Sequence, residues 1–160
     1  MRVKRILLAS AILAALAFAA ALLPQVAASG SSQAQSAVPA FHRELPAGRL
    51  PATLGPSLFT DPIVQNAYAI AARIKKTLYQ EPCYCHCDRS QGHGSLLDCF
   101  ASRHGSGCGI CMREALYTSE QLAKGVSTAQ IREAIIRSDW EKLDLARYQK
   151  FPPVPAPAEN

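Results

Sequence analysis

Outside residues 82–112 the sequence contains no cysteine and only one histidine, His42. It also lacks a Ser/His/Asp arrangement, a glycine-rich phosphate loop and a pair of acidic residues in a convincing site. These absences argue against a serine hydrolase, a nucleotide-binding loop and catalysis by paired carboxylates. The chemistry of this chain is therefore confined to one stretch, and it is thiol chemistry with imidazole nearby.

That stretch reads PCYCHCDRSQGHGSLLDCFASRHGSGCGICM. Its cysteines follow the pattern C-x-C-x-C, then eleven residues, C, then eight residues and C-x-x-C. In an extended chain alternate side chains share a face, so an extended segment over residues 83–87 is expected to direct its three thiols to one side. The polar, glycine-containing residues 88–94 are expected to form a loop. The candidate ligands within it are all six cysteines of the chain and three of its four histidines: Cys83, Cys85, Cys87, Cys99, Cys108, Cys111, His86, His93 and His104.

The N-terminal residues predict export. Basic residues are followed by an almost unbroken apolar run over residues 6–23, and small residues at 26–28 offer a cleavage site before Ser29. This arrangement is typical of a secretory signal peptide, here residues 1–28. An uncleaved membrane anchor is the alternative, because the run is just long enough to span a bilayer. No cysteine follows the run, which argues against a lipid anchor on cysteine. We expect a periplasmic or extracellular location.

The net charge of the chain does not indicate a charged binding partner. The formal net charge of +5 falls to +2 once the three cations of the signal are removed, so neither nucleic acid nor an anionic membrane is indicated. Membrane contact is expected only through an uncleaved signal. The hydrophobic content of 49% is likewise raised by the signal. A small exported core of this kind usually needs disulfides or a metal for stability.

The rest of the chain predicts a small all-α fold, a bundle of about four helices with the cysteine-rich loop packed on it. Apolar residues recur at helical spacing, and no stretch reads as a convincing strand. Thr60, Ser95 and Ser127 are suitable N-caps, and Gln130 completes a capping box with Ser127. The expected segments are a flexible spacer (29–57), a Cys/His-rich helical domain (58–148) and a proline-rich disordered tail (149–160), with helices near 61–81, 96–103, 108–125 and from 128 onward.

Metal binding is the first interpretation of the cysteine pattern. Thiolate and imidazole are the ligands that Cu(I) and Zn(II) prefer. Cys108 and Cys111 lie three apart at a predicted helix start, so both sulfur atoms face one side and the helix N-terminus favours their thiolate form. Nine donors exceed the needs of one tetrahedral ion. One closed site would leave thiols over, whereas two ions or a small Cu(I)–thiolate cluster would use them.

Two other interpretations stay open. An exported chain with an even number of cysteines is the usual setting for disulfides, and a disulfide-stapled envelope or interaction module would fit. Cys108-x-x-Cys111 at a helix start is also a redox geometry, although thiol oxidoreductases place it after a strand. Attached haem would need C-x-x-C-H, and Met112 follows Cys111. The spacing also matches neither common ferredoxin pattern.

The motif resembles a known family. Pro82 to Cys87 reads P-C-Y-C-H-C, and Cys99-Phe100, His104-Gly105, the C-x-x-C pair and Glu114-Ala115 follow in order. On these residues the chain resembles the small exported bacterial proteins named for a PCYCGC motif, also called the CYCXC family, over about residues 80–140. His86 replaces the glycine of the motif. Many members are lipoproteins, from which this chain differs. Some carry selenocysteine at a motif position, which implies reactive or metal-binding sulfur.

The sequence thus favours an extracytoplasmic metal-binding protein, more a carrier than an enzyme. Copper as Cu(I) is the first expected metal and zinc the second, because a sulfur-rich exported site suits both. We expect the six cysteines to be the main ligands, with His93 and His104 as additional candidates and His86 as a weaker one. The expected role is sequestration or delivery, and the partners are the metal ion and a metal-delivery or envelope protein.

Overall fold

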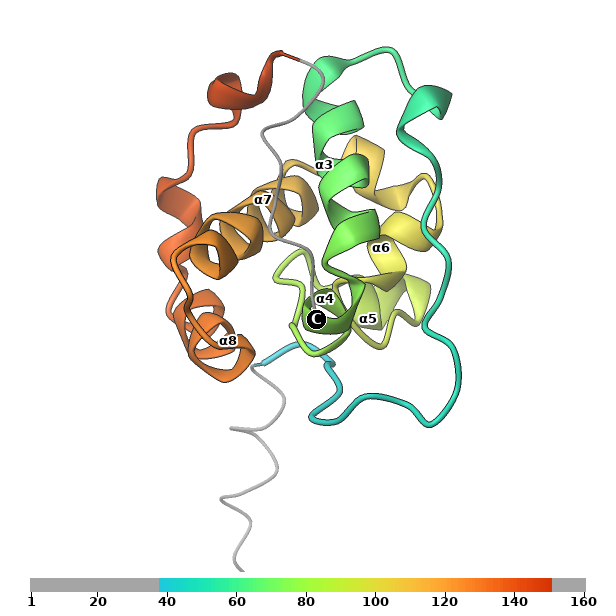
Figure 1. The fold of residues 1–160 in the computed structure, drawn as a ribbon. Helices are drawn as coiled ribbons and strands as arrows, with labels where there is room; N and C mark the ends of the chain where they lie inside the picture. Colours follow the sequence, from blue (N-terminus) through green and yellow to red (C-terminus); the bar gives the residue numbers. More distant parts are fainter. Residues whose placement is uncertain (1–37, 151–160) are drawn as a thin grey trace, which may run out of the picture. The chain divides into compact units, whose positions relative to one another are not determined.

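The computed structural model describes residues 38–150, and every regular element among them is a helix (Figure 1). No strand occurs in this range, so the predicted all-α class is confirmed. None of the helices described has the length and apolarity that crossing a bilayer requires. The predicted signal peptide and residues 151–160 of the predicted tail lie outside the described range. In chain order the elements are η2 (Pro56–Leu58), α3 (Pro62–Arg73), α4 (Lys75–Tyr79), α5 (Cys87–Gln91), α6 (Asp98–Ala101), η3 (His104–Gly107), α7 (Gly109–Ala123), α8 (Thr128–Ile136), η4 (Asp139–Lys142) and η5 (Leu145–Tyr148).

The first predicted helix is divided in two. Asp61, rather than Thr60, is the N-cap of α3, because its carboxylate accepts a hydrogen bond from the N–H of Ile63 at 2.8 Å. Pro62 follows at the first helical position, where the missing N–H costs nothing. At Ile74 the backbone leaves the helical region (φ −114°, ψ 34°), and α4 continues the chain. Ile74 is itself fully buried, so the apolar stripe runs across the break.

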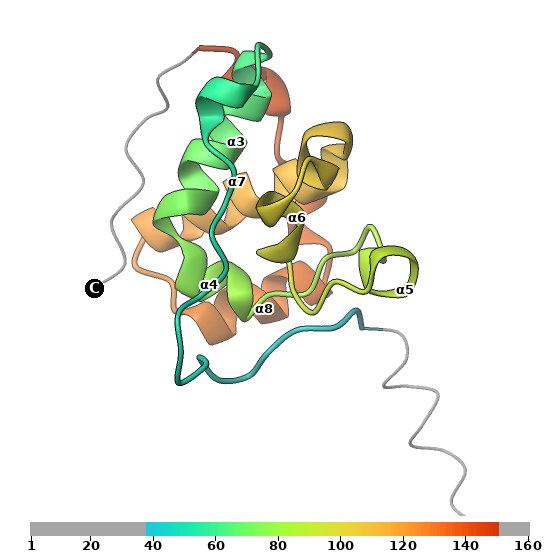
Figure 2. The same cartoon turned by 90° about the vertical axis from the view of Figure 1, so that its right-hand side faces the viewer.

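The core lies between α3 and α7, which pack side by side (Figures 1 and 2). The ring of Tyr68 on α3 contacts Phe59 and Phe100, with ring centroids 4.2 and 5.1 Å apart. The Tyr68 hydroxyl donates to the carbonyl of Ser102 at 2.6 Å and accepts from the N–H of Ser106 at 3.1 Å. The core helix therefore holds the loop that leads into the C-x-x-C pair.

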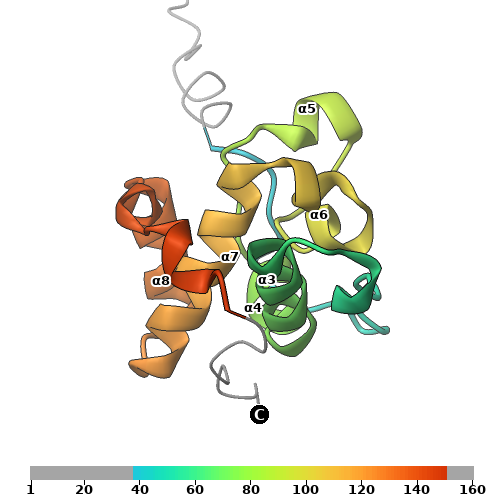
Figure 3. The ribbon, with the colours of Figure 1, turned by 90° about the horizontal axis from the view of Figure 1, so that it is seen from above.

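The C-terminal helices cover the other side of α7. Figure 3 shows α8 on one side of α7, with α5 and α6 on the opposite side. The predicted capping box is confirmed: the Ser127 side chain accepts from the N–H of Gln130, and the Gln130 side chain accepts from the N–H of Ser127. Ile131, Ile135 and Trp140 form a second buried cluster here. This part of the fold supports α7 and leaves its N-terminal end to the cysteines.

Residues 38–57, the described part of the predicted spacer, differ from the expectation of a flexible segment. They run along α3 and α4 (Figure 2), and Leu50 and Leu54 pack on the core. The N–H of Leu54 donates to the carbonyl of Phe100 at 2.9 Å. His42 stacks on Tyr79 with ring centroids 4.0 Å apart. A few apolar and aromatic residues thus dock a segment whose composition is that of a linker.

Candidate metal centre

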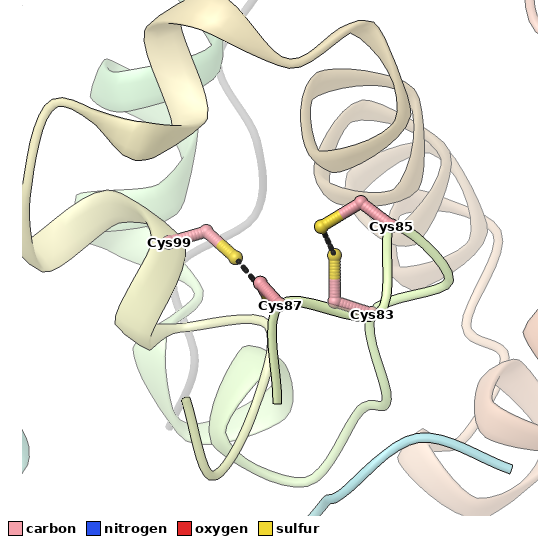
Figure 4. A group of neighbouring side chains, drawn as sticks. All are labelled: Cys83, Cys85, Cys87 and Cys99. Atoms are coloured by element: carbon pink, nitrogen blue, oxygen red, sulfur yellow. Dashed lines mark hydrogen bonds between the residues drawn. The ribbon is translucent and has the colours of Figure 1, made fainter. Parts of the chain in front are cut away.

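Three short segments bring the sulfur atoms together. The first is the C-x-C-x-C turn at residues 83–87, the second is α6 with Cys99, and the third is the N-terminus of α7 with Cys108 and Cys111. Figure 4 shows Cys83, Cys85, Cys87 and Cys99 pointing toward one another from the first two segments. The α-helical core and the Tyr68 hydrogen bonds position the third segment against them.

The C-x-C-x-C segment is a turn, which corrects the expectation of an extended chain. The N–H of His86 donates to the carbonyl of Cys83 at 3.1 Å, and His86 has a left-handed backbone with φ 55°. Cys87 then begins α5, so the predicted loop over residues 88–94 is largely a short helix. The turn still directs all three thiols inward, because it curls around them instead of alternating faces.

Replacing His86 by glycine is expected to stabilise the metal-free protein by about 0.5–1 kcal/mol, because a left-handed backbone is strained for residues with a Cβ and free for glycine. The Nδ1 atom of His86 is also buried without a hydrogen-bond partner. Urea unfolding of the reduced protein measures the change. His86→Ala keeps the Cβ and serves as the control. Equal stabilisation by alanine would show that backbone strain is not the cause.

Cys83, Cys85 and Cys111 form a triangle of sulfur atoms. The Cys83 and Cys85 sulfurs are 3.3 Å apart, and each lies 3.5 Å from the sulfur of Cys111. In a tetrahedral zinc–thiolate site with bonds of about 2.3 Å, neighbouring sulfur atoms lie roughly 3.8 Å apart. The sulfurs are therefore close enough to bind one ion or two adjacent ions. This triangle joins the turn to the start of α7.

On the other side of the cluster, the sulfurs of Cys87 and Cys99 lie together with the ring of His93. The Cys87 and Cys99 sulfurs are 3.3 Å apart, and the Nδ1 atom of His93 lies 3.4 Å from the Cys99 sulfur. The rings of His93 and His104 meet edge to face, with centroids 5.1 Å apart. The Nε2 atom of His104 in turn lies 3.5 Å from the sulfur of Cys85. Imidazoles therefore connect the two halves of the cluster.

Three overlapping groups of four donor atoms result, and within each group all atoms lie within 4.8 Å of one another. They use eight of the nine residues that the sequence singled out. His86 belongs to none of them, and its ring packs edge to face against Tyr84. His42 also stays outside the groups. The three groups are Cys83, Cys85, Cys87 and Cys99; Cys85, His104, Cys108 and Cys111; and Cys87, His93, Cys99 and His104.

All six cysteines are free thiols in the structure. The shortest sulfur–sulfur contact of 3.3 Å is a hydrogen bond, well beyond the roughly 2.05 Å of a disulfide. The arrangement shares each sulfur among several neighbours instead of pairing it with one. Such an arrangement could hold metal ions. It is less suited to three separate disulfide bonds.

The thiols differ in acidity. Cys108 is the N-cap of α7, and the neighbouring Cys111 thiol together with the N–H groups at the helix N-terminus lower the pKa of Cys108 to about 5. A hydrogen bond from the Cys83 thiol is the main cause that lowers the pKa of Cys85 to about 7. Hydrogen bonds with Cys111, Cys85 and Cys87, together with burial, raise the pKa of Cys83. Hydrogen bonds from the Cys83 and Cys99 thiols lower the pKa of Cys87. Thiolates, the metal-binding form, are thus favoured first at Cys87, Cys108 and Cys85.

Glu114 is a member of the site whose role the sequence did not reveal. It lies on α7 one turn after Cys111 and is 0% exposed. Its Oε1 accepts a hydrogen bond from the N–H of Tyr84 at 2.8 Å, which anchors the C-x-C-x-C turn to the helix. Burial raises the pKa of the carboxyl well above its usual value. The available signal was a glutamate on the buried face of α7 at helical spacing from Cys111.

A second acidic side chain is buried beside the turn. Glu81 is 0% exposed, and neither of its carboxyl oxygens has a hydrogen-bond partner. Burial raises its pKa to about 9, although the charge of Arg132 opposes this. Both buried carboxyls near the cluster thus have raised pKa values.

Comparison with known proteins adds one result. A family model described as a protein of unknown function with PCYCGC motif matches residues 42–143. No curated protein and no solved structure matches the chain. The matched range contains every donor of the cluster, and the motif places glycine where this chain has His86, the position with the left-handed backbone. The chain therefore belongs to the family of PCYCGC-motif proteins, whose function is unknown.

Proposed function

We propose that this protein binds a soft metal ion outside the cytoplasm, Cu(I) in the first place and Zn(II) in the second, for sequestration or delivery. The observation that carries the proposal is the convergence of six free sulfur atoms and two imidazole nitrogens in overlapping groups of four. Thiolate-rich sets select Cu(I) and Zn(II) over hard cations such as Mg²⁺ and Ca²⁺. No other described part of the chain gathers such donors.

The surroundings of the cluster support a binding role more than a catalytic one. Four of the six cysteines are buried, and the side chain of Glu114 fixes the turn that carries three of them. In metal sites, the residues that bind the ion are typically held in position by neighbouring buried groups of this kind. The signal-like N-terminus supports export, where a sulfur-rich site would meet copper and a protein that receives it.

Chelator competition with reduced protein tests the proposal. The mature chain is incubated anaerobically with Cu(I) or Zn(II) bound to a coloured chelator, and transfer of metal to the protein is measured. We expect uptake of both ions, with Cu(I) held more tightly. Absence of uptake for both ions would contradict the proposal. Protein isolated without reductant can also be weighed by mass spectrometry. A mass lower than that of the reduced chain by the six hydrogens lost in three disulfides, with no bound metal, would favour the disulfide-linked module instead.

Thiol–disulfide exchange is a second candidate, favoured by the acidity of Cys108. Its pKa of about 5 and its place at the start of a long helix are features of attacking thiolates. Exchange through Cys108 would form a mixed disulfide that Cys111 resolves. The Cys108 thiolate of the reduced Cys111→Ser variant would attack a disulfide of a model substrate such as oxidised, scrambled ribonuclease, release one substrate thiol and remain trapped in the mixed disulfide. Absence of trapping would remove this candidate.

A further inference from the structure

We propose that the cluster holds two metal ions in unlike positions, an inner and an outer one, and that the sulfur of Cys85 is shared between them. This inference rests on the proposed metal binding and adds to it the number of ions and their order of release.

The choice of donor sets follows from the use of sulfur. The groups Cys83/Cys85/Cys87/Cys99 and Cys85/His104/Cys108/Cys111 together contain all six thiols and overlap only at Cys85. Any combination with the third group leaves out Cys83 or the C-x-x-C pair. The first two groups therefore define the two positions, which we call the inner and the outer site.

Cys85 lies where a shared ligand has to lie. Its sulfur is 3.3 Å from that of Cys83 in the inner site, and it is 3.5 Å from both the Cys111 sulfur and the His104 Nε2 atom in the outer site. A thiolate has enough lone pairs to bind two ions at once. The two sites are consequently adjacent, and the Cys85 sulfur would form one bond to the ion in each of them.

Charge also favours two ions. Six thiolates around a single divalent ion would leave a net charge of about −4 in a largely buried site, and an uncompensated buried charge is strongly unfavourable. A second divalent ion halves that excess.

The two positions differ in access to solvent. Cys83 and Cys87 are 2% exposed and Cys99 is 0% exposed, whereas three of the four outer donors are half-buried. Pro39 and Ala40 also lie against the inner site, since they line a small cavity with Cys83 and Cys87. The N–H of Ala40 donates to the Asp88 carboxylate at 3.3 Å and helps to hold this cover. The outer ion is thus open to an incoming donor, and the inner ion is enclosed.

Zn(II) alone is the probe for the test, because it favours four ligands. Native mass spectrometry of the reduced mature chain is expected to show two zinc ions. Transfer to an excess of a coloured chelator should be biphasic, with equal amplitudes and rates that differ by tenfold or more. Because both measurements use the unaltered protein, they do not depend on whether a variant folds.

Three variants assign the phases. Cys108→Ser should retain one slowly released ion, Cys99→Ser one rapidly released ion, and Cys85→Ser should weaken both. His86→Gly is the matched control within the motif and should retain two. Circular dichroism verifies that each variant is helical. If Cys99→Ser does not fold, Cys85→Ser, at a half-buried position, still distinguishes a shared ligand from an unshared one.

The outcomes separate the two proposals. Failure of the unaltered protein to bind zinc and Cu(I) would contradict the proposed function itself. One zinc ion per chain would leave that function intact and overturn this inference. Release of two ions at a single rate would contradict the claim that the two sites differ. Loss of only one ion in Cys85→Ser would contradict the claim that Cys85 binds both ions.

Discussion

Removal of metal from the loaded protein is expected to lower its melting temperature by roughly 15 °C. A ligand that binds only the folded state at a free concentration 1,000-fold above its Kd adds about 4 kcal/mol of stability, and a domain of this size shifts by about 4 °C for each kcal/mol. The folded state is expected to bind much more tightly than the unfolded chain, because the donors come from three segments that folding brings together. The bound metal is expected to link the three segments and so to supply stability that the small core lacks.

The measurement is a thermal melt followed by circular dichroism, with reduced protein in the presence of Zn(II) or Cu(I) and again after chelation. A Cys99→Ser/Cys111→Ser double variant, which has lost one sulfur of each site, is the control and should show a much smaller shift. A loaded and a metal-free protein with equal melting temperatures would show that binding does not tie the three segments together.

Replacement of Glu114 by alanine is expected to cost about 3 kcal/mol of stability in the metal-free protein and to weaken metal binding by 10- to 100-fold. The substitution removes a fully buried side chain and leaves the Tyr84 N–H without its acceptor. Loss of buried volume and of a buried acceptor each cost one to several kcal/mol. The turn that carries three of the thiols loses its anchor, and groups that orient metal ligands have effects of this size on affinity.

Glu114→Gln separates the anchor from the charge. Burial raises the pKa of Glu114 and so favours its neutral carboxyl form, and glutamine matches the shape and the acceptor oxygen of that form. We expect this variant to lose less than about 1 kcal/mol and to bind metal nearly as well as the original protein. Urea unfolding and chelator competition measure the two quantities. A glutamine variant as weak as the alanine variant would point to an ionised Glu114.

Local signals predicted the boundaries of α7 and α8 well. The capping box of Ser127 and Gln130 and the glycine at Gly125, whose φ is 78°, mark boundaries that the structure reproduces. The start of α7 next to the C-x-x-C pair follows from the same kind of short-range chemistry. Such features depend on neighbours in sequence, so the sequence alone contains the information needed to find them.

The site itself depends on contacts between distant residues, and these were less predictable. Cysteine and histidine content indicated which side chains to examine, but period-two alternation suggested an extended C-x-C-x-C segment. The left-handed backbone of His86 and the bond from Glu114 to the Tyr84 N–H determine the turn instead. The left-handed position leaves no signal in residue spacing, and the helical spacing of Glu114 from Cys111 does not by itself indicate a hydrogen bond to the turn. The docking of residues 38–57 was missed for the same reason, because stacking of His42 on Tyr79 involves residues far apart in sequence.

The closeness of the donors in sequence has a kinetic consequence. No two consecutive cysteines are separated by more than eleven residues, and loops of that length close within about 10–100 ns. The hydrogen bond from Asn66 to the Tyr148 carbonyl, by contrast, spans 82 positions. The loops between the cysteines are therefore expected to close before such long-range contacts form. If the protein binds metal as proposed, we expect an ion that is present during refolding to speed the appearance of the native state.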